Sequence, residues 1–388
     1  AALSAKMSDT DSQQGEVAQD LSNSDVVTKY KAAAEICNKA ITAVIEACKD
    51  GAKVVDVCNL GDNLINKEVA GIFSKKKFER GVAFPTCLSV NSVVGHYSPL
   101  ADDATTLKNG DVVKIDLGVH IDGFVATQAS TIVIQDGAAP VTGKTADAIQ
   151  AARTAFDAAL RLIRPGKHIA DVAGPLNQIV EAYGCNLVEG VMSHEMKQFI
   201  IDGNKCVLNK PTPEHRVEDG EFEENEVYAI DIVVSTGDGK TKVQDEKQTT
   251  VYKRALDAAY NLKLKASRAV FSIINSKYPA MPFTMRALAE SAEKDAKEPL
   301  GAAQLNLGLK ECVAHGLLHA YPVLHEKTGE VVVQIKGTVL LMPNGSDLVT
   351  KAPVQAVTSE KKVEDKEILE LLSQSIKKQK KKKDKAAA

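Results

Sequence analysis

Two short stretches of the chain repeat one another, and each places an acid inside an apolar strand. Residues 111–116 read DVVKID and residues 226–231 read EVYAID. The β-branched residues predict a strand in both places, where a buried carboxylate is costly unless a metal, a cation or several donors pair with it. The repeat predicts a duplicated half-domain whose equivalent strands turn Asp116 and Asp231 toward one site. In the alternative interpretation, each Asp only marks the end of its strand.

The first of these strands is predicted to enter a β-hairpin. A second β-rich run spans 124–134, and Asp122 and Gly123 lie between the two runs. This dipeptide favours a two-residue type I′ turn, because glycine accepts the positive φ that the turn needs.

Length and composition limit the classes of protein that fit. The 388 residues correspond to one large domain or two ordinary ones, and 44% hydrophobic residues suffice for a sizeable core. The net charge of −3 gives no global attraction to nucleic acid, so such binding needs local patches. Seven cysteines without a CxxC pair indicate a reducing compartment. Because we find no membrane-length apolar run and no signal-peptide pattern, we expect an intracellular, soluble protein without membrane contact.

Periodicity and punctuation then predict the order of the elements. Helices are expected at 26–48, 55–73, 142–163, 169–183 and 363–376, and a strand at 330–342. Residues 237–328 interrupt this pattern with a basic segment, helical runs and turns. The ends of the chain are polar, and residues 377–385 read KKQKKKKDK.

Five motifs together resemble one known fold. They are GHYSP at 95–99, KIDLG at 114–118, SHEMKQF at 193–199, YAID at 228–231 and TVLL at 338–341. In this order they resemble the α/β pita-bread fold of methionine aminopeptidases, type 2 above all. The resemblance implies two pseudo-symmetric halves around a dinuclear metal site, with a helical insert at approximately 240–325. We expect a flexible N-terminal tail at 1–25, the pita-bread domain at 26–349 and a polar, Lys-rich tail at 350–388.

The resemblance also implies five metal-ligand positions, and this chain departs from the family at three of them. Asp116 and His194 are retained, and Asp231 stands where the family has the longer Glu. Thr127 and Lys336 replace the two carboxylates that bridge the metals. Two divalent ions about 3.5–4 Å apart need bridging anions, whereas an ammonium nearby costs roughly 4 kcal/mol at ~4 Å. We therefore predict a degenerate metal site in which Lys336 pairs with Asp116 or Asp231, and we expect neither metal nor other cofactor.

The acid/base positions of the family fall on His96, which is retained, and on Asp202, where a second histidine is lost. This pattern predicts that the chain is not an enzyme and has no catalytic residues. Two alternatives stay open: a metallo-aminopeptidase with an altered, mononuclear site held by Asp116, His194 and Asp231, and a module that binds peptide N-termini.

Within this superfamily the chain resembles the ErbB-3-binding, or proliferation-associated, protein family. The resemblance rests on YKR at 252–254, LKLKASRAVFS at 262–272, MPFTMRAL at 281–288, VLLMPNG at 339–345 and the Lys-rich tail. It implies a non-catalytic monomer that binds rRNA and other RNA, pre-ribosomal particles and the large ribosomal subunit, with regulatory protein partners. It further implies roles in rRNA processing, translation and cell growth, and a location in cytoplasm, nucleus and nucleolus.

Basic residues supply candidates for the RNA contacts. Two sets are predicted: Lys253, Arg254, Lys263, Lys265 and Arg268 in the insert, and Lys380, Lys381, Lys382 and Lys383 in the tail. Such patches suit phosphate contacts; the alternatives are an exposed basic helix and a solubilising tail. His315 and His319 are expected four residues apart on a helix, with a structural role, and Ile368 begins an I-x-x-L-L pattern in a helix that docks on its own domain.

Overall fold

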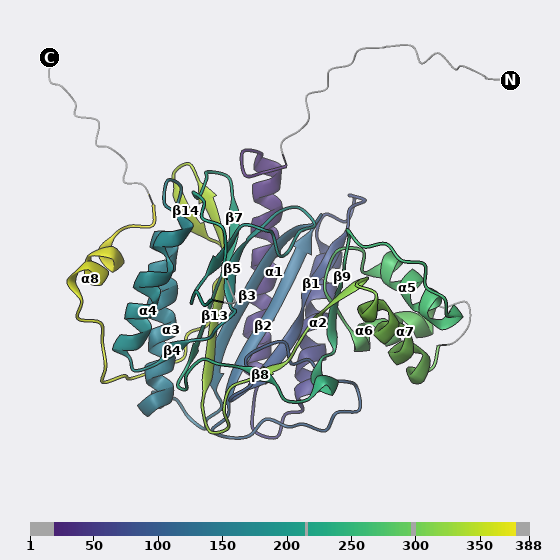
Figure 1. Cartoon of the computed structure of the whole chain (residues 1–388), viewed down its shortest axis with the longest axis horizontal. Helices are drawn as coiled ribbons and strands as arrows, with labels where there is room; N and C mark the ends of the chain where they lie inside the picture. The colour runs from purple at the N-terminus through teal and green to yellow at the C-terminus, as the bar shows by residue number, and fades with distance from the viewer. Residues whose placement is uncertain (1–18, 214–215, 296–299, 378–388) are drawn as a thin grey trace, which may run out of the picture.

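The structure is a computed structural model, and it describes residues 19–213, 216–295 and 300–377 (Figure 1). The α-helices are α1 (Ser24–Ala47), α2 (Val54–Gly71), α3 (Gly143–Leu162), α4 (Ala173–Ala182), α5 (Lys265–Lys277), α6 (Met285–Asp295), α7 (Ala302–Ala314) and α8 (Lys366–Ser373). The strands are β1 (Arg80–Val90), β2 (Val112–Ile121), β3 (Phe124–Val133), β4 (Asn186–Leu187), β5 (Met192–Met196), β6 (Cys206–Leu208), β7 (Val227–Ser235), β8 (Lys242–Val243), β9 (Val251–Arg254), β10 (Phe283–Thr284), β11 (Leu318–Tyr321), β12 (Leu324–His325), β13 (Val332–Met342) and β14 (Gly345–Leu348).

One large antiparallel sheet organises the molecule. Its strands run in the order β1-β2-β3-β13-β7-β5-β6, with β14 beside β13 and β4 beside β7. Helices α1 and α2 pack on β1 to β3, and α3 packs on β7 and β13 with α4 beside it. Figure 1 shows these helical pairs against the two halves of the sheet. The repeated arrangement is the two-half architecture that the duplicated strands predict.

Strand alternation turns the two acids away from the helices. Ile115 and Leu117 flank Asp116 and lie in the core cluster formed with α1 and α2. Ile230 and Ile232 flank Asp231 and lie in the cluster formed with α3 and α4. Because successive side chains of a strand point to opposite faces, both carboxylates project from the face that these helices leave uncovered. This face carries the candidate site.

The predicted hairpin joins β2 and β3. Its turn residues Asp122 and Gly123 have φ values of 55° and 77°, as a type I′ turn requires. A Cβ on Gly123 would lie 2.6 Å from the ring of Phe199. Glycine is therefore needed here both for the backbone conformation and for the close approach of the segment after β5.

The insert is a smaller unit with its own core. A three-stranded sheet, β10-β9-β11, packs with α5 to α7, and the two-stranded ladder of β8 and β12 lies at its entry and exit. Arg286 ties the insert to the main domain. Its guanidinium donates to Asn59 Oδ1 at 3.0 Å, to Ser98 Oγ at 3.1 Å and to the Pro99 carbonyl. The GHYSP motif therefore contributes to this junction through its last two residues.

Parts of both expected tails pack on the main domain. Leu21 is buried in a cluster with residues of α1, and Ser24 already begins that helix. At the other end, Ile368 of α8 is buried against the α3 core, and Arg161 Nε donates to the Gln374 carbonyl at 2.8 Å. The docking of this helix on its own domain, predicted from the I-x-x-L-L pattern, is confirmed. Residues 1–18 and Lys380, Lys381, Lys382 and Lys383 lie outside the described residues.

Candidate functional site

The site is built on one transverse row of residues across four adjacent strands. Asp116 on β2 lies opposite Ala129 on β3, Ala129 lies opposite Lys336 on β13, and Lys336 lies opposite Asp231 on β7. Directly opposed residues share a face of the sheet. The small methyl side chain of Ala129 leaves room for Lys336 to reach across β3 to Asp116.

Lys336 bonds both acids of the row. Its Nζ lies 2.6 Å from Asp116 Oδ2 and 3.1 Å from Asp231 Oδ2. The three side chains are 9%, 4% and 12% exposed, so the ion pairs are largely shielded from water. Gln334 Nε2 donates to both oxygens of Asp231, at 3.0 and 3.1 Å. The pairing of Lys336 with the retained acids, predicted from its charge, is confirmed.

The environment keeps the Lys336 ammonium charged and raises the pKa of Asp116. Burial disfavours the Lys336 ammonium, but the charges of Asp116 and Asp231 and their hydrogen bonds outweigh it and raise the pKa of Lys336 above its ordinary value. Burial first, and repulsion by Asp231 second, raise the pKa of Asp116, although Lys336 acts in the opposite direction. Both shifts have one cause: two carboxylates share a single cation in a shielded place, which stabilises the charged lysine and disfavours a second negative charge.

These residues do not fit the dinuclear metal centre that the fold family implies. A cation already sits between the two retained carboxylates, and Thr127 and Lys336 supply no anion that would bridge two metals. Across the described ranges, no cluster of three or more His, Cys, Asp and Glu residues is arranged to hold a metal ion. We therefore derive no chemistry through a metal here.

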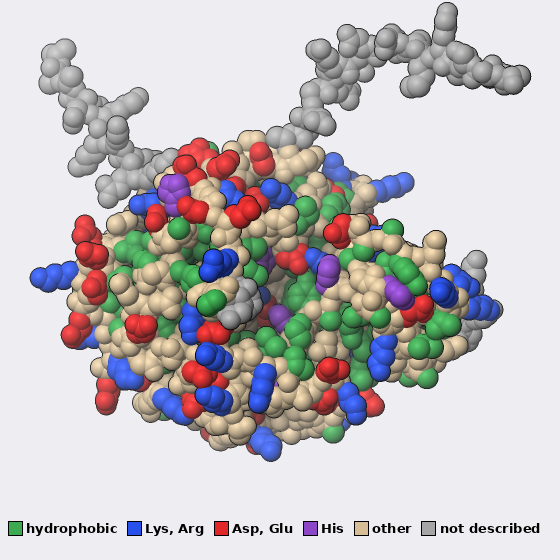
Figure 2. Space-filling view, in the orientation of Figure 1, with side chains coloured by type: hydrophobic (Ala, Val, Ile, Leu, Met, Phe, Trp, Pro, Cys, Tyr) green, Lys and Arg blue, Asp and Glu red, His purple; other side chains and the backbone are tan. Residues whose placement is uncertain are grey.

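The other predicted site residues surround a cavity of about 720 Å³ next to the row. Thr127, His194 and Asp231 line it together with Lys336, and so do the former acid/base positions His96 and Asp202. The structure thus brings every predicted metal-site and acid/base position together, with Asp116 behind Lys336. On the face shown in Figure 2, histidine and hydrophobic side chains border a central hollow, in keeping with this lining.

Both histidines of the cavity are held neutral. Burial, and secondly the charge of Lys336, lower the pKa of His96 to about 4 and also lower the pKa of His194. His96 has a φ of 65°, and its ring lies 5.8 Å from Phe84 and 5.3 Å from Tyr321. A neutral imidazole in an aromatic wall presents hydrogen-bonding groups without charge.

Comparison with known proteins agrees with this geometry. The profile of metallopeptidase family M24 matches residues 28–253, more than half of the chain. The protein ErbB-3 binding protein 1 of Solanum tuberosum is 54% identical over 361 residues, which cover 92% of this chain and 89% of that protein. The chain belongs to metallopeptidase family M24. Within the family it belongs to the ErbB-3-binding proteins, as the motifs predicted.

Solved structures confirm the fold. A structure described as a thermophilic Arx1 superposes with a TM-score of 0.83 at 29% identity and covers 92% of this chain and 100% of its own. The methionine aminopeptidase of Thermotoga maritima superposes with a TM-score of 0.55 at 18% identity and covers 85% and 98%. The pita-bread fold predicted from the motifs is thus confirmed. None of the helices in the described ranges is long and apolar enough to cross a membrane.

One predicted RNA contact of this M24 member belongs instead to the cavity mouth. The Lys253 ammonium is bonded to Asp202 Oδ1, and its side chain is only 16% exposed. Tyr321 Oη donates to the other oxygen of Asp202 at 3.5 Å. The alternation of β9 separates Lys253 from Arg254, which stacks on Phe271 with its guanidinium carbon 5.9 Å from the ring centre. The spacing of the charges in the sequence did not indicate that Lys253 and Arg254 lie on a strand, where their side chains point to opposite faces.

The other three predicted RNA contacts of the insert lie at the start of α5. Lys263, Lys265 and Arg268 are exposed, and Arg268 also donates to the Leu262 and Lys263 carbonyls at 3.1 and 2.6 Å. Next to them Tyr260 stacks on His315 with ring centres 3.7 Å apart. We call Tyr260, Lys263, Lys265 and Arg268 the insert patch.

The expected helical pair of His315 and His319 is wrong, because α7 ends at Ala314 and His319 lies on β11.

Gln334 and Tyr321 are site residues that the sequence reasoning missed. Gln334 lies two positions before Lys336 on β13, so the period-two rule places both side chains on one face. That signal was available in the sequence. Tyr321 comes from the far end of the insert, and only the pairing of β11 with β9 brings it beside Asp202.

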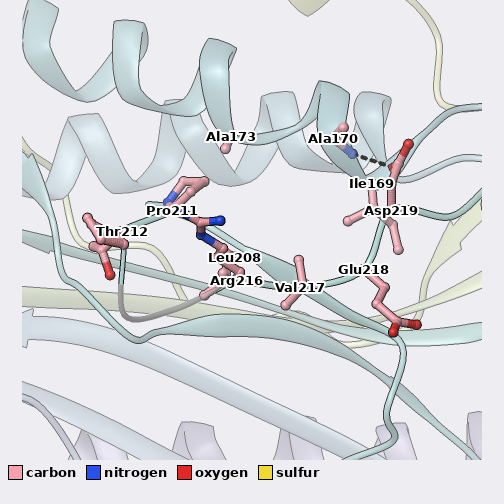
Figure 3. A pocket seen from close by; sticks show the side chains of 11 residues that line it. Ile169, Ala170, Ala173, Leu208, Pro211, Thr212, Arg216, Val217, Glu218 and Asp219 are labelled. Atoms are coloured by element: carbon pink, nitrogen blue, oxygen red, sulfur yellow. Dashed lines mark hydrogen bonds between the residues drawn. The ribbon is translucent and has the colours of Figure 1, made fainter.

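A second cavity, of about 550 Å³, lies between the start of α4 and the segment after β6 (Figure 3). Asp219 Oδ1 accepts a hydrogen bond from the Ala170 amide at 3.0 Å across its edge. Pro213 and Arg216, which also line it, flank residues 214–215 outside the described ranges. We assign no ligand to this cavity.

Proposed function

We propose that this protein is a non-catalytic aminopeptidase-fold protein that binds RNA and associates with ribosomal particles. The observation that carries the proposal is the position of Lys336, whose ammonium bonds both retained acids where the family places a pair of metals. Without that pair, the fold has no Lewis acid to polarise a peptide carbonyl and no metal-bound water to attack it.

The loss of the second acid/base histidine supports the same conclusion. Asp202 stands at that position, and both of its oxygens are engaged by Lys253 and Tyr321. The neutral His96 alone cannot both deliver and accept the protons of peptide hydrolysis without an activated water. An aminopeptidase with one metal on Asp116, His194 and Asp231 would first have to displace Lys336 from both acids.

The insert patch supports RNA as the partner. It gathers cations suited to phosphate contacts beside an exposed aromatic ring, the combination used for flexible single-stranded RNA. The family resemblance implies rRNA, pre-ribosomal particles and the large ribosomal subunit. On that basis we place the protein in cytoplasm, nucleus and nucleolus, as a monomer acting in rRNA processing, translation and growth control.

Charge reversal in the insert patch tests the RNA proposal. We expect Lys263→Glu with Lys265→Glu to weaken binding of a single-stranded rRNA fragment roughly tenfold at about 0.1 M salt. Each lost phosphate contact should also lower the slope of log K against log salt by about 0.7. The matched control is Lys39→Glu with Lys144→Glu, two exposed cations elsewhere with the same change in net charge. Equal RNA affinity of both double variants and the wild type would reject the insert patch.

A further inference from the structure

A further cavity, of about 280 Å³, lies between the main domain and the insert. Helix α2 and strands β1 and β2 line it from the main domain, and residues 277–284 and α6 line it from the insert. Its described lining includes none of the row of Asp116, Lys336 and Asp231 and none of the insert patch. Clefts between two structural units often bind small ligands, and the proposed function does not use this one.

The cavity holds an empty spot that two polar atoms border. A Cβ placed on Gly81 would lie 3.6 Å from Asn66 Oδ1 and 3.8 Å from His120 Nε2, and no other described atom outside residues 80–82 lies within 4 Å of it. Gly81 and His120 are opposed on β1 and β2, so they share this face of the sheet. A ligand atom that donates hydrogen bonds fits this spot.

His120 reaches the cavity as a neutral ring. The residue is 6% exposed, and its Nδ1 is buried without a hydrogen-bond partner among the described residues. Burial lowers the pKa of His120 to about 4, so the ring carries no charge at neutral pH. A neutral imidazole with its proton on Nδ1 accepts a hydrogen bond at Nε2, which suits an amine donor.

Asp62, one turn before Asn66 on α2, supplies a largely buried negative charge to the same cavity. Its Oδ1 accepts a hydrogen bond from the Thr86 amide at 2.8 Å. Its Oδ2 lies 3.9 Å from Arg286 Nη2, too far for a hydrogen bond. Burial raises the pKa of Asp62 to about 6, although Arg286 acts in the opposite direction. A second cation in hydrogen-bonding contact would therefore stabilise the carboxylate.

The other charged residues of the lining leave this carboxylate available. Arg80 Nη1 donates to a backbone carbonyl at 2.8 Å, and Lys294 lies 3.9 Å from Glu290 with 73% of its side chain exposed. Lys277 is exposed, and Glu79 adds a further acid. Arg80 and Lys294 are thus held by groups other than the inner carboxylate.

We propose that this cavity binds a linear polyamine. One amine pairs with the Asp62 carboxylate, and another donates to Asn66 Oδ1 and His120 Nε2, one helical turn of about 5.4 Å further along α2. The methylene chain between the amines packs on Val82 and Met281, which also line the cavity. A cation carried on methylenes satisfies both the charge and the apolar part of the lining, which an anion would not.

Calorimetry at about pH 7.5 on the full chain, freed of nucleic acid, tests the proposal with three probes. Spermidine carries several amines, butylamine carries a single amine on a similar chain, and adipate carries carboxylates in place of amines. We expect spermidine to bind with a Kd below about 1 mM, at least about tenfold more tightly than butylamine, and adipate not to bind. Butylamine or adipate binding as tightly as spermidine would overturn the proposal, and so would the absence of spermidine binding below about 1 mM.

Asp62→Asn tests the charge. The change removes the carboxylate but keeps an acceptor for the Thr86 amide, so spermidine binding should weaken at least about tenfold. The matched control is Asp56→Asn, which changes the net charge equally at an exposed position of the same helix and should leave binding unchanged.

Gly81→Val tests the empty spot. Gly81 lies in β1 without a left-handed φ, so valine is compatible with its backbone, fills the spot and should abolish binding. Gly71→Val, at the exposed end of α2 with no described atom within 4 Å of its Cβ position, should not change it. Thermal unfolding shows which variants are folded. Wild-type affinity for spermidine in either folded variant, Asp62→Asn or Gly81→Val, would overturn the site.

Discussion

Replacing Lys336 by methionine should destabilise the protein more than any exposed ion pair can explain. The change keeps the length of the side chain but leaves Asp116 and Asp231 buried together without their cation. At an effective dielectric near 20, the two ion pairs at 2.6 and 3.1 Å correspond to about 6 and 5 kcal/mol of Coulomb energy. Desolvation offsets much of this, so we expect the free energy of unfolding to fall by about 3–5 kcal/mol at pH 7.5.

The stability lost in Lys336→Met should depend on pH, and the direction of that dependence tests whether the paired acids cause the loss. In the Lys336→Met protein the pKa of Asp116 should rise further, because burial and Asp231 then act without opposition. The folded state then keeps a proton on Asp116 to a higher pH than the unfolded state does. The stability of the variant should therefore rise as the pH falls toward the ordinary range of an aspartate carboxyl.

Urea denaturation at several pH values measures both effects. The matched control is Lys327→Met, since Lys327 lies 2.7 Å from Asp238 but the two side chains are 68% and 44% exposed. We expect that control to lose much less stability than Lys336→Met does, and Asp116→Asn added to Lys336→Met to recover part of the loss. A Lys336→Met protein within about 1 kcal/mol of the wild type, with a flat pH profile, would refute the reasoning.

Three further perturbations follow from the described contacts. Burial lowers the pKa of His120 from 6.5 to about 4, so the stability this neutral histidine contributes is complete above pH 6.5. About 3 kcal/mol should be lost as the pH falls to 4, and His120→Gln should flatten this acid limb in urea titrations; an unchanged limb would contradict the assignment. Arg286→Met should cost about 3–5 kcal/mol, because it frees Ser98 and leaves the partly shielded Asp62 without its cation; a loss under 1 kcal/mol in the same assay would speak against the junction. Ala129→Leu should cost about 1–3 kcal/mol by overpacking and should separate Lys336 from Asp116, and a melting temperature equal to the wild type would show that the row tolerates bulk at its centre.

The parts of the structure that the sequence predicted are those in which a local pattern also determines the fold. The repeated strands placed Asp116 and Asp231 on one face, because alternation along a strand is a backbone property. The opposite charge of Lys336 predicted its partners, since a buried ammonium needs a counter-charge and the two acids are the carboxylates of its row. The hairpin at Asp122 and Gly123 follows from turn geometry in the same way.

The parts that the sequence did not predict depend on contacts between distant segments. Lys253 looked like a member of a basic cluster until the pairing of β9 turned it toward Asp202. Tyr321 joins the site only because β11 pairs with β9 and brings it beside Asp202. Neither contact leaves a periodic signal, because each is a single residue placed by tertiary packing.

The most direct test of the account is the metal content of the protein beside that of a variant with restored ligands. We would measure cobalt and manganese by elemental analysis after loading and dialysis, in the wild type and in Thr127→Asp with Lys336→Glu. The account predicts well under one metal per chain in the wild type, no cleavage of a Met-peptide, and stoichiometric metal in the double variant. Two metals per wild-type chain, with turnover of that peptide, would contradict the claim that Lys336 occupies the place of the metals.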